Sequence, residues 1–246
     1  MSLSIQAENT FNNFIGGSWI PPAQASYLTL ECEEGITRLP NSGADDIEHA
    51  LLAAQRSSQA WLNLSVFRRL DCLVELGRLT EVYEESQRLC ATQNRCANHW
   101  RAGGSEISKA RYHLNNPQAA FVLSPCDPKD NQTITVGKLF FEPSTSINEA
   151  FRQIAPALAS GYTLVAALLH QPHQQQCLQL MSFMEFAAHS LPPGVLNLVY
   201  GLGLEIGVPL IRSDLAVAFD SVSPIKQIDN GLSVKINIDN EYSQRI

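Results

Sequence analysis

The second half of the chain alternates apolar runs with amphipathic segments, and this alternation limits the choice of fold more than any other feature. Tyr162–Leu168 is a nearly continuous apolar run, as expected for a parallel strand that is buried on both faces. Similar runs follow at Val195–Tyr200 and Leu215–Phe219, and helical patterns lie between the runs at His173–His189 and Leu204–Arg212. Strands and helices that alternate at this spacing predict βαβ units and a Rossmann-like, doubly wound parallel sheet.

The first half of the chain predicts short strands followed by long helices. Phe14–Ile20 indicates a hairpin around a Gly-Gly turn, and Tyr27–Leu30 and Ile36–Leu39 are further short strands. Ser42, or Asp45 just after it, is the expected cap of the first helix. The apolar periodicity then places helices at about 46–64 and 66–96, and a short third helix that ends near residue 114.

Composition excludes several classes of function. The net charge is −7 and the basic residues form no stripe, which argues against nucleic-acid binding. Charged residues make up only 17% of the chain, which fits either a protein that hides surface in an oligomer or one with a large core. The six cysteines show neither C-x-x-C pairs nor zinc-site spacing, so we expect no metal and a reducing compartment. Without a signal peptide or a long apolar stretch, a cytoplasmic protein with no membrane partner is expected.

Three segments, in this order, resemble the N-terminal half of the aldehyde dehydrogenase superfamily. They are Phe14–Trp19, Ala155–Gly161 and Leu191–Asn197, and the order of elements matches that family from about residue 11 to residue 219. The resemblance implies a cofactor domain of the Rossmann type, onto which the N-terminal strands and long helices wrap, and NAD or NADP as the cofactor. The half that carries the family's catalytic cysteine is not in this sequence, which ends at Ile246.

The positions that hold the cofactor's ribose in the family carry different chemistry here. By the resemblance, the family's lysine falls on Ala167 and its glutamate on His170. Replacing both charged groups removes hydrogen bonds worth about 1.5 to 3 kcal/mol each. The stretch that should supply the oxyanion-binding asparagine reads Glu142–Ser146, and loss of such a donor typically lowers the rate about 10²- to 10³-fold.

The phosphate loop and the general base also depart from the family. The matching loop is Phe219–Ser223, in which Ser221 stands for the glycine and Asp220 adds a negative charge near the expected phosphate. A weaker match places Lys235 at the general-base glutamate. We therefore assign no catalytic residue.

Two glycines are the remaining candidates for cofactor binding. Gly201–Gly207 looks like a dinucleotide fingerprint, but its third glycine comes one residue late. Because the matching loop of the family lines the adenine pocket, Gly203 and Gly207 are retained as vestigial cofactor-binding residues, with a plain turn and helix start as the alternative. Two interpretations are open for His170 and His173: they form part of a metal or anion site, or they belong to a loop that precedes a solvated helix start.

These observations predict one domain with three segments. Residues 1–117 hold the N-terminal strands and helices, residues 118–143 form the middle segment, and residues 144–246 are Rossmann-like. The middle segment occupies the place of the hairpin that the family uses for subunit contact, so it is a candidate oligomerisation hairpin. The leading hypothesis is a pseudoenzyme without a bound cofactor that acts as a homo-oligomer or on a protein partner. The alternatives are an NAD(P)-dependent aldehyde dehydrogenase completed by a second chain, and a nucleotide-sensing regulator.

Overall fold

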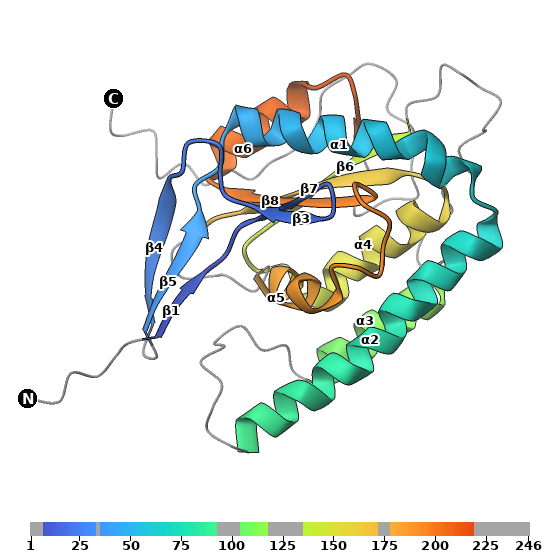
Figure 1. Ribbon diagram of the computed structural model, residues 1–246, viewed down its shortest axis with the longest axis horizontal. Coiled ribbons are helices and arrows are strands. Elements are labelled where there is room, and N and C mark those ends of the chain that lie inside the picture. The colour runs from blue at the N-terminus through green and yellow to red at the C-terminus, as the bar shows by residue number, and fades with distance from the viewer. Residues whose placement is uncertain (1–6, 33–34, 93–103, 118–134, 172–177, 219–246) are drawn as a thin grey trace, which may run out of the picture.

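A six-stranded sheet with helices on both faces forms the centre of the computed structural model (Figure 1). The structure describes residues 7–32, 35–92, 104–117, 135–171 and 178–218. In spatial order the strands are β3 (Ser18–Ile20), β2 (Asn13–Ile15), β8 (Leu196–Gly201), β7 (Thr163–Leu169), β6 (Val136–Phe141) and β9 (Val217–Ala218). The last four run parallel, which confirms the predicted α/β fold with a Rossmann-like parallel sheet.

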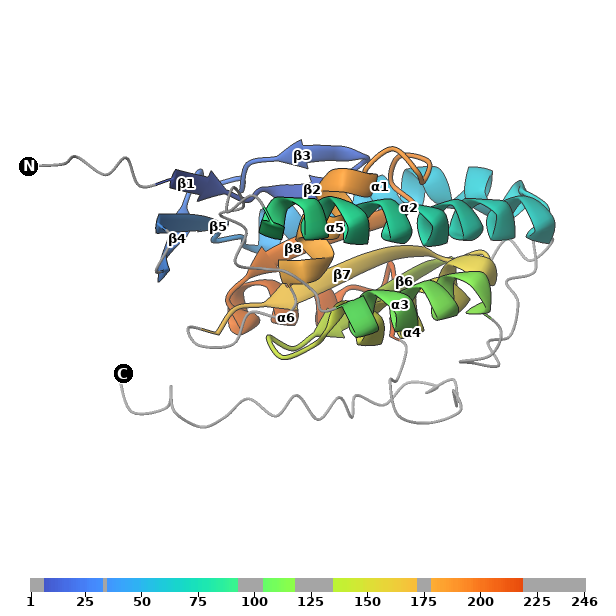
Figure 2. The same cartoon turned by 90° about the horizontal axis from the view of Figure 1, so that it is seen from below.

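Two layers of helices cover this sheet, as Figures 1 and 2 show. The helices are α1 (Ala44–Asn63), α2 (Val66–Thr92), α3 (Gly104–Asn115), α4 (Ile147–Ala159), α5 (Leu178–Ala187) and α6 (Gly203–Arg212). One face packs against α1 and α6, and the other against α4 and α5. Helices α2 and α3 lie outside α4, so α2 runs along the edge of the molecule.

The N-terminal strands are confirmed and divide between two sheets. The hairpin β2–β3 turns through Gly16 and Gly17, whose φ angles of 62° and 81° favour glycine. It extends the central sheet, because Phe14 pairs with Leu198 of β8. A separate three-stranded sheet, at the left in Figure 1, contains β1 (Ala7–Thr10), β5 (Gly35–Pro40) and β4 (Tyr27–Cys32) in that order.

The connection from α4 to β7 shows why the first two helices wrap onto the sheet. Gly161 has the left-handed φ of 101° that was predicted for the residue after the helix. The last carbonyls of α4 accept hydrogen bonds from two buried side chains, since Trp61 Nε1 donates to Leu158 O at 3.0 Å and Arg69 Nε donates to Ala159 O at 3.0 Å. The end of α4 is therefore satisfied by residues from α1 and α2.

The prediction of an oligomerisation hairpin over residues 118–143 is wrong for the part that the structure describes. Val136–Phe141 is β6, which lies between β7 and β9 in the middle of the parallel sheet and is almost entirely buried. Its apolar residues are core residues, so they offer no surface to a partner. The Rossmann-like part therefore begins at β6 rather than at residue 144, and residues 118–134 lie outside the described residues.

Lysine 138 gives β6 a further tie to its neighbours. The buried Nζ of Lys138 donates to Ile211 O at 2.9 Å and Ser213 O at 3.1 Å, at the C-terminal end of α6. An ammonium at this end of a helix meets carbonyls that have no partner within the helix. Burial lowers the pKa of Lys138, and the charge of Asp214 acts in the opposite direction.

Candidate functional site

The carboxyl ends of β7 and β8 are the place where a fold of this kind binds ligands. The two strands are parallel neighbours, with Leu168 beside Tyr200 and Leu169 beside Gly201. His170 follows β7 directly, and its backbone N–H donates to Gly201 O at 2.8 Å. After β8 the chain turns at Leu202 and enters α6 at Gly203. The fold thus brings His170 to the same edge of the sheet as the start of α6.

His170 and Tyr200 form a hydrogen-bonded pair at this edge. His170 Nδ1 lies 2.8 Å from Tyr200 Oη, and the rings meet edge to face with their centroids 5.8 Å apart. Burial lowers the pKa of the His170 imidazole, which favours its neutral form. A neutral imidazole that shares a proton with a phenol leaves one nitrogen for another partner, whereas a carboxylate would offer two acceptor oxygens.

Ala167 belongs to the core and not to an open site. Its side chain is fully buried in the apolar cluster between the sheet, α1 and α6. Successive residues of β7 alternate between this cluster and the one on the other face, as a strand covered on both sides requires. The position that corresponds to the family's lysine, by the resemblance, is therefore occupied by a methyl group packed among apolar side chains.

Gly203 and Gly207 both lie on α6, but they differ in exposure. Gly203 is the exposed first residue of the helix, and Gly207 is buried one turn later. A Cβ built at either position meets no atom of the described residues within 4 Å. The described residues therefore do not require glycine at either position. Glu205 places a negative charge in the first turn, where it opposes the attraction of the helix N-terminus for an anion.

The sterically required glycine of this loop is Gly201, which the sequence reasoning did not select. A Cβ on Gly201 would lie 2.9 Å from Ile206 Cγ2 and 3.0 Å from Ser42 O. Because the backbone of the loop before α1 approaches the end of β8 so closely, no side chain fits there. A glycine at the end of a buried strand was the one signal that pointed to it.

A buried polar network beneath Tyr200 was also missed. Asn13 is fully buried, and its Oδ1 accepts the backbone N–H of Tyr200 at 3.1 Å. Its Nδ2 donates to Ser42 Oγ at 2.8 Å and to Asp46 Oδ1 at 3.3 Å. Ser42 therefore serves this network and does not cap α1. The N-cap residue is Gly43, whose N–H donates to Asp46 Oδ2 at 3.1 Å.

The loop after β6 is used for capping. Ser146, at the end of the stretch that resembles the family's oxyanion segment, is the N-cap of α4. Its Oγ accepts from Glu149 N at 3.3 Å, while Glu149 Oε2 accepts from Ser146 N at 2.9 Å. The other predicted positions, His173, Asp220, Ser221 and Lys235, lie outside the described residues.

A surface hollow of about 320 Å³ lies elsewhere, between α2 and α3. It is lined by Glu81, Glu84, Glu85, Ser108 and Arg111, and so shares no residue with the edge formed by His170 and α6. Arg111 Nη1 forms an ion pair with Glu81 Oε1 at 2.8 Å. In the described part of the chain, no group of three or more His, Cys, Asp or Glu side chains is arranged to hold a metal. No described helix combines the length and the apolar character needed to cross a membrane.

Comparison with known proteins finds relatives that cover most of this chain. Acetaldehyde dehydrogenase 2 of Cupriavidus necator is 28% identical over 229 residues, which cover 87% of this chain and 44% of the relative. The chain is similar to aldehyde dehydrogenases over more than four fifths of its own length. It spans less than half the length of the curated relatives that it matches. No family model matches the chain.

Solved structures of the aldehyde dehydrogenase superfamily share the fold. The NAD-dependent aldehyde dehydrogenase from Sinorhizobium meliloti superposes with a TM-score of 0.65 at 18% identity, over 86% of this chain and 44% of that enzyme. PnpE, solved in complex with nicotinamide adenine dinucleotide, has a TM-score of 0.65 at 19% identity, over 84% of this chain and 44% of PnpE. The resemblance found from sequence segments is thus confirmed for the family and for the Rossmann-like cofactor fold.

Proposed function

We propose that this chain is a non-catalytic, aldehyde-dehydrogenase-like protein that acts by association with another protein chain. The observation that carries this proposal is the chemistry at the carboxyl edge of β7. Ala167 fills an apolar cluster, and the imidazole of His170 is engaged by Tyr200. Neither residue supplies the charge that the resemblance assigns to ribose binding, and Ala167 leaves no open space for a ligand.

The arrangement of the neighbouring groups supports the same function. Ser146 is committed to capping α4, and Glu205 puts a negative charge beside the start of α6. An anionic cofactor would therefore meet repulsion in place of a phosphate seat. In this proposal the chain acts as a homo-oligomer or in a complex with a protein partner, and NAD and NADP have no role.

Cofactor titration tests the proposal directly. Purified chain is titrated with NAD and with NADP by calorimetry, and its thermal unfolding is followed at millimolar cofactor. Ligand that binds the folded state raises the midpoint by mass action, so an unchanged midpoint and no heat are expected. PnpE, which was solved in complex with nicotinamide adenine dinucleotide, serves as the control that must respond to NAD. Saturable cofactor binding, or aldehyde oxidation by the isolated chain, would overturn the proposal.

One observation favours nucleotide sensing as a second candidate function. Gly203 is exposed at the start of α6 and leaves open space above the helix among the described residues. The first backbone N–H groups of a helix can bind a phosphate group, although Glu205 weakens this attraction. Binding of NAD or of an adenine nucleotide without turnover, abolished by Gly203→Asp, would replace the leading proposal with this one.

A further inference from the structure

Helix α2 leaves an apolar stripe in solvent on its outward face. Phe67 is 79% exposed, Val74 is 52% exposed and Val82 is 44% exposed. The opposite face of the helix packs into the core through Leu73 and Leu76. Because large apolar side chains of one helix rarely gather on its free face, this stripe is a candidate interaction surface.

The charges on the stripe are arranged in a self-complementary order. Along the helix, Asp71 lies between Phe67 and Val74, and Arg78 lies between Val74 and Val82. Their side chains are 71% and 61% exposed, respectively. Phe67, Asp71, Val74 and Arg78 follow one another at spacings of four, three and four residues, so they share one face of the helix. The face therefore carries an apolar residue, an anion, an apolar residue and a cation in sequence.

We propose that this face pairs with the same face of a second copy of the chain, antiparallel about a two-fold axis between Val74 and Glu75. This pairing puts Asp71 opposite the partner's Arg78, and Phe67 opposite the partner's Val82. A parallel pairing would instead place Asp71 against Asp71 and Arg78 against Arg78. Opposite charges across the contact select the antiparallel arrangement, which is closed by two-fold symmetry.

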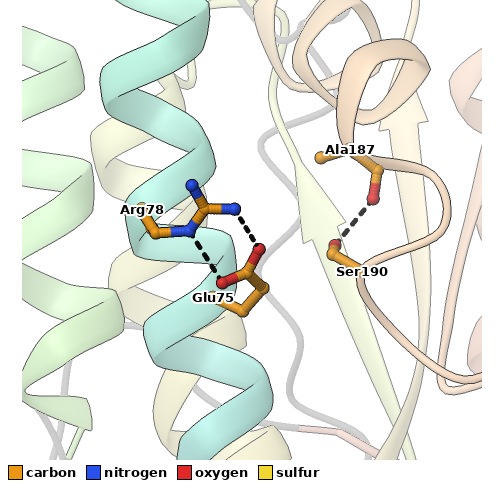
Figure 3. A network of polar contacts seen from close by, with 4 residues as sticks. All are labelled: Glu75, Arg78, Ala187 and Ser190. Atoms are coloured by element: carbon orange, nitrogen blue, oxygen red, sulfur yellow. Dashed lines mark hydrogen bonds and ion pairs between the residues drawn. The ribbon is translucent and has the colours of Figure 1, made fainter.

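Arg78 has enough N–H donors to bond Glu75 of its own chain and a carboxylate of the partner at the same time. In the single chain its Nε donates to Glu75 Oε2 at 2.9 Å and its Nη2 donates to Glu75 Oε1 at 2.6 Å. Figure 3 shows this pair on α2, apart from the hydrogen bond of Ser190 to Ala187 at the end of α5. A guanidinium has five N–H donors, so Arg78 retains donors for the partner's Asp71. Among the described residues, Asp71 has a loose contact of 3.9 Å with Arg68.

The proposal rests on the proposed function, since it names the second copy as the associating partner. Its test is a charge swap in the full chain, followed by sedimentation velocity over a concentration series. Asp71→Lys alone and Arg78→Glu alone each create two like-charge contacts across the two-fold axis. We expect each to weaken dimerisation about tenfold. The double variant Asp71→Lys/Arg78→Glu exchanges the charges and is expected to restore the wild-type constant.

A matched control and a geometric probe complete the experiment. Glu48→Lys reverses an exposed charge on α1 and is expected to leave dimerisation unchanged. Val74→Cys places a thiol beside the axis, so a short bismaleimide should join two copies more efficiently than it joins Glu48→Cys chains or wild-type chains, which already contain six cysteines.

Three results would overturn the proposal. They are a wild-type chain that stays monomeric at about 100 µM, a dimer that ignores both single reversals, and a monomer whose α2 face binds a full-length aldehyde dehydrogenase. None of these results bears on the proposal that the chain binds no cofactor. Binding of NAD by the chain would contradict the proposed function instead, whatever the oligomeric state, so the two failures are distinguishable.

Discussion

The carboxyl edge of β7 and β8 and the outward face of α2 use their side chains in opposite ways. At the edge, polar groups bond one another within the chain, since His170 bonds Tyr200 and Asn13 bonds the backbone of Tyr200. On α2, apolar groups such as Phe67 stand in solvent. A site that binds a small ligand keeps polar groups free, whereas a surface that binds a protein keeps apolar area exposed.

This difference shows that a fold and a ligand site depend on different residues of the chain. The fold depends on apolar periodicity, on the turn at Gly161 and on the buried contacts that end α4, and all of these remain. A ligand site depends on a few charged groups, and substitution of Ala167 or His170 changes it without disturbing the sheet. Under the proposed function, the scaffold acts through its surface, while its edge carries side chains other than those that the resemblance assigns to ribose binding.

The largest expected effect comes from placing the family's lysine back into the edge. Ala167→Lys forces a long cation into a closely packed apolar cluster, so we expect the free energy of unfolding to fall by at least about 3 kcal/mol. Urea unfolding measures the loss. Ala60→Lys, on the exposed side of α1, is the matched control and should change stability by less than about 0.5 kcal/mol. A stable Ala167→Lys chain that gains affinity for NAD would show that the edge is still an open site.

The second effect tests whether the polar groups of the edge depend on one another. Asn13→Ala leaves the Tyr200 N–H and the buried Ser42 without their partner, which should cost about 2 to 4 kcal/mol of stability. Asn63→Ala removes an exposed hydrogen bond to Gln59 and is expected to be nearly neutral. Equal stabilities of the two variants in urea would mean that water replaces Asn13 without loss.

Much of the fold was predictable from the sequence because it follows local rules. Gly161 ends α4 as expected, and the apolar run of β7 is a strand buried on both faces. The position of β6 was not predictable in the same way. Its residues and the alternating residues before it fit a surface hairpin equally well, and only its pairing with β7 and β9 identifies it as a central strand.

The candidate site was predictable in its position but not in its contacts. Strand order alone places His170 near the start of α6, since parallel strands end at one edge. The bond from Tyr200 N to Asn13 joins residues 187 positions apart, and no local pattern announces such a contact. The role of Ser42 was mistaken for the same reason, because its hydroxyl satisfies Asn13 across the fold instead of its own helix.

A smaller effect concerns the pH dependence of stability. The pKa of His170 is lowered by burial from its ordinary value of 6.5, so between these two values the folded chain binds fewer protons than the unfolded chain. The free energy of unfolding therefore rises with pH in this interval; the gain is complete above pH 6.5 and is lost as pH falls through the folded pKa. His170→Gln should flatten this slope in urea unfolding from pH 5 to 7.5.

Two other groups define the controls for that slope. Burial also lowers the pKa of His113, so some slope is expected to remain in His170→Gln. Tyr200→Phe removes the phenol and keeps the buried imidazole, and should retain the dependence on pH. If His170→Gln and the wild-type chain showed the same slope, the imidazole would titrate as it does in water, and the edge would be open to solvent.

The smallest effect on stability is expected on α2, and it sharpens the contrast between the two regions. Phe67 is mostly in solvent in the single chain, so Phe67→Ser should change the free energy of unfolding of the monomer by less than about 0.5 kcal/mol. The same variant should weaken dimerisation, because the exposed ring has a partner only in the pair. Urea unfolding at low concentration and sedimentation at high concentration measure the two quantities. A marked loss of monomer stability would show that Phe67 belongs to the fold, and the outward face of α2 would then resemble the edge of the sheet in serving the chain itself.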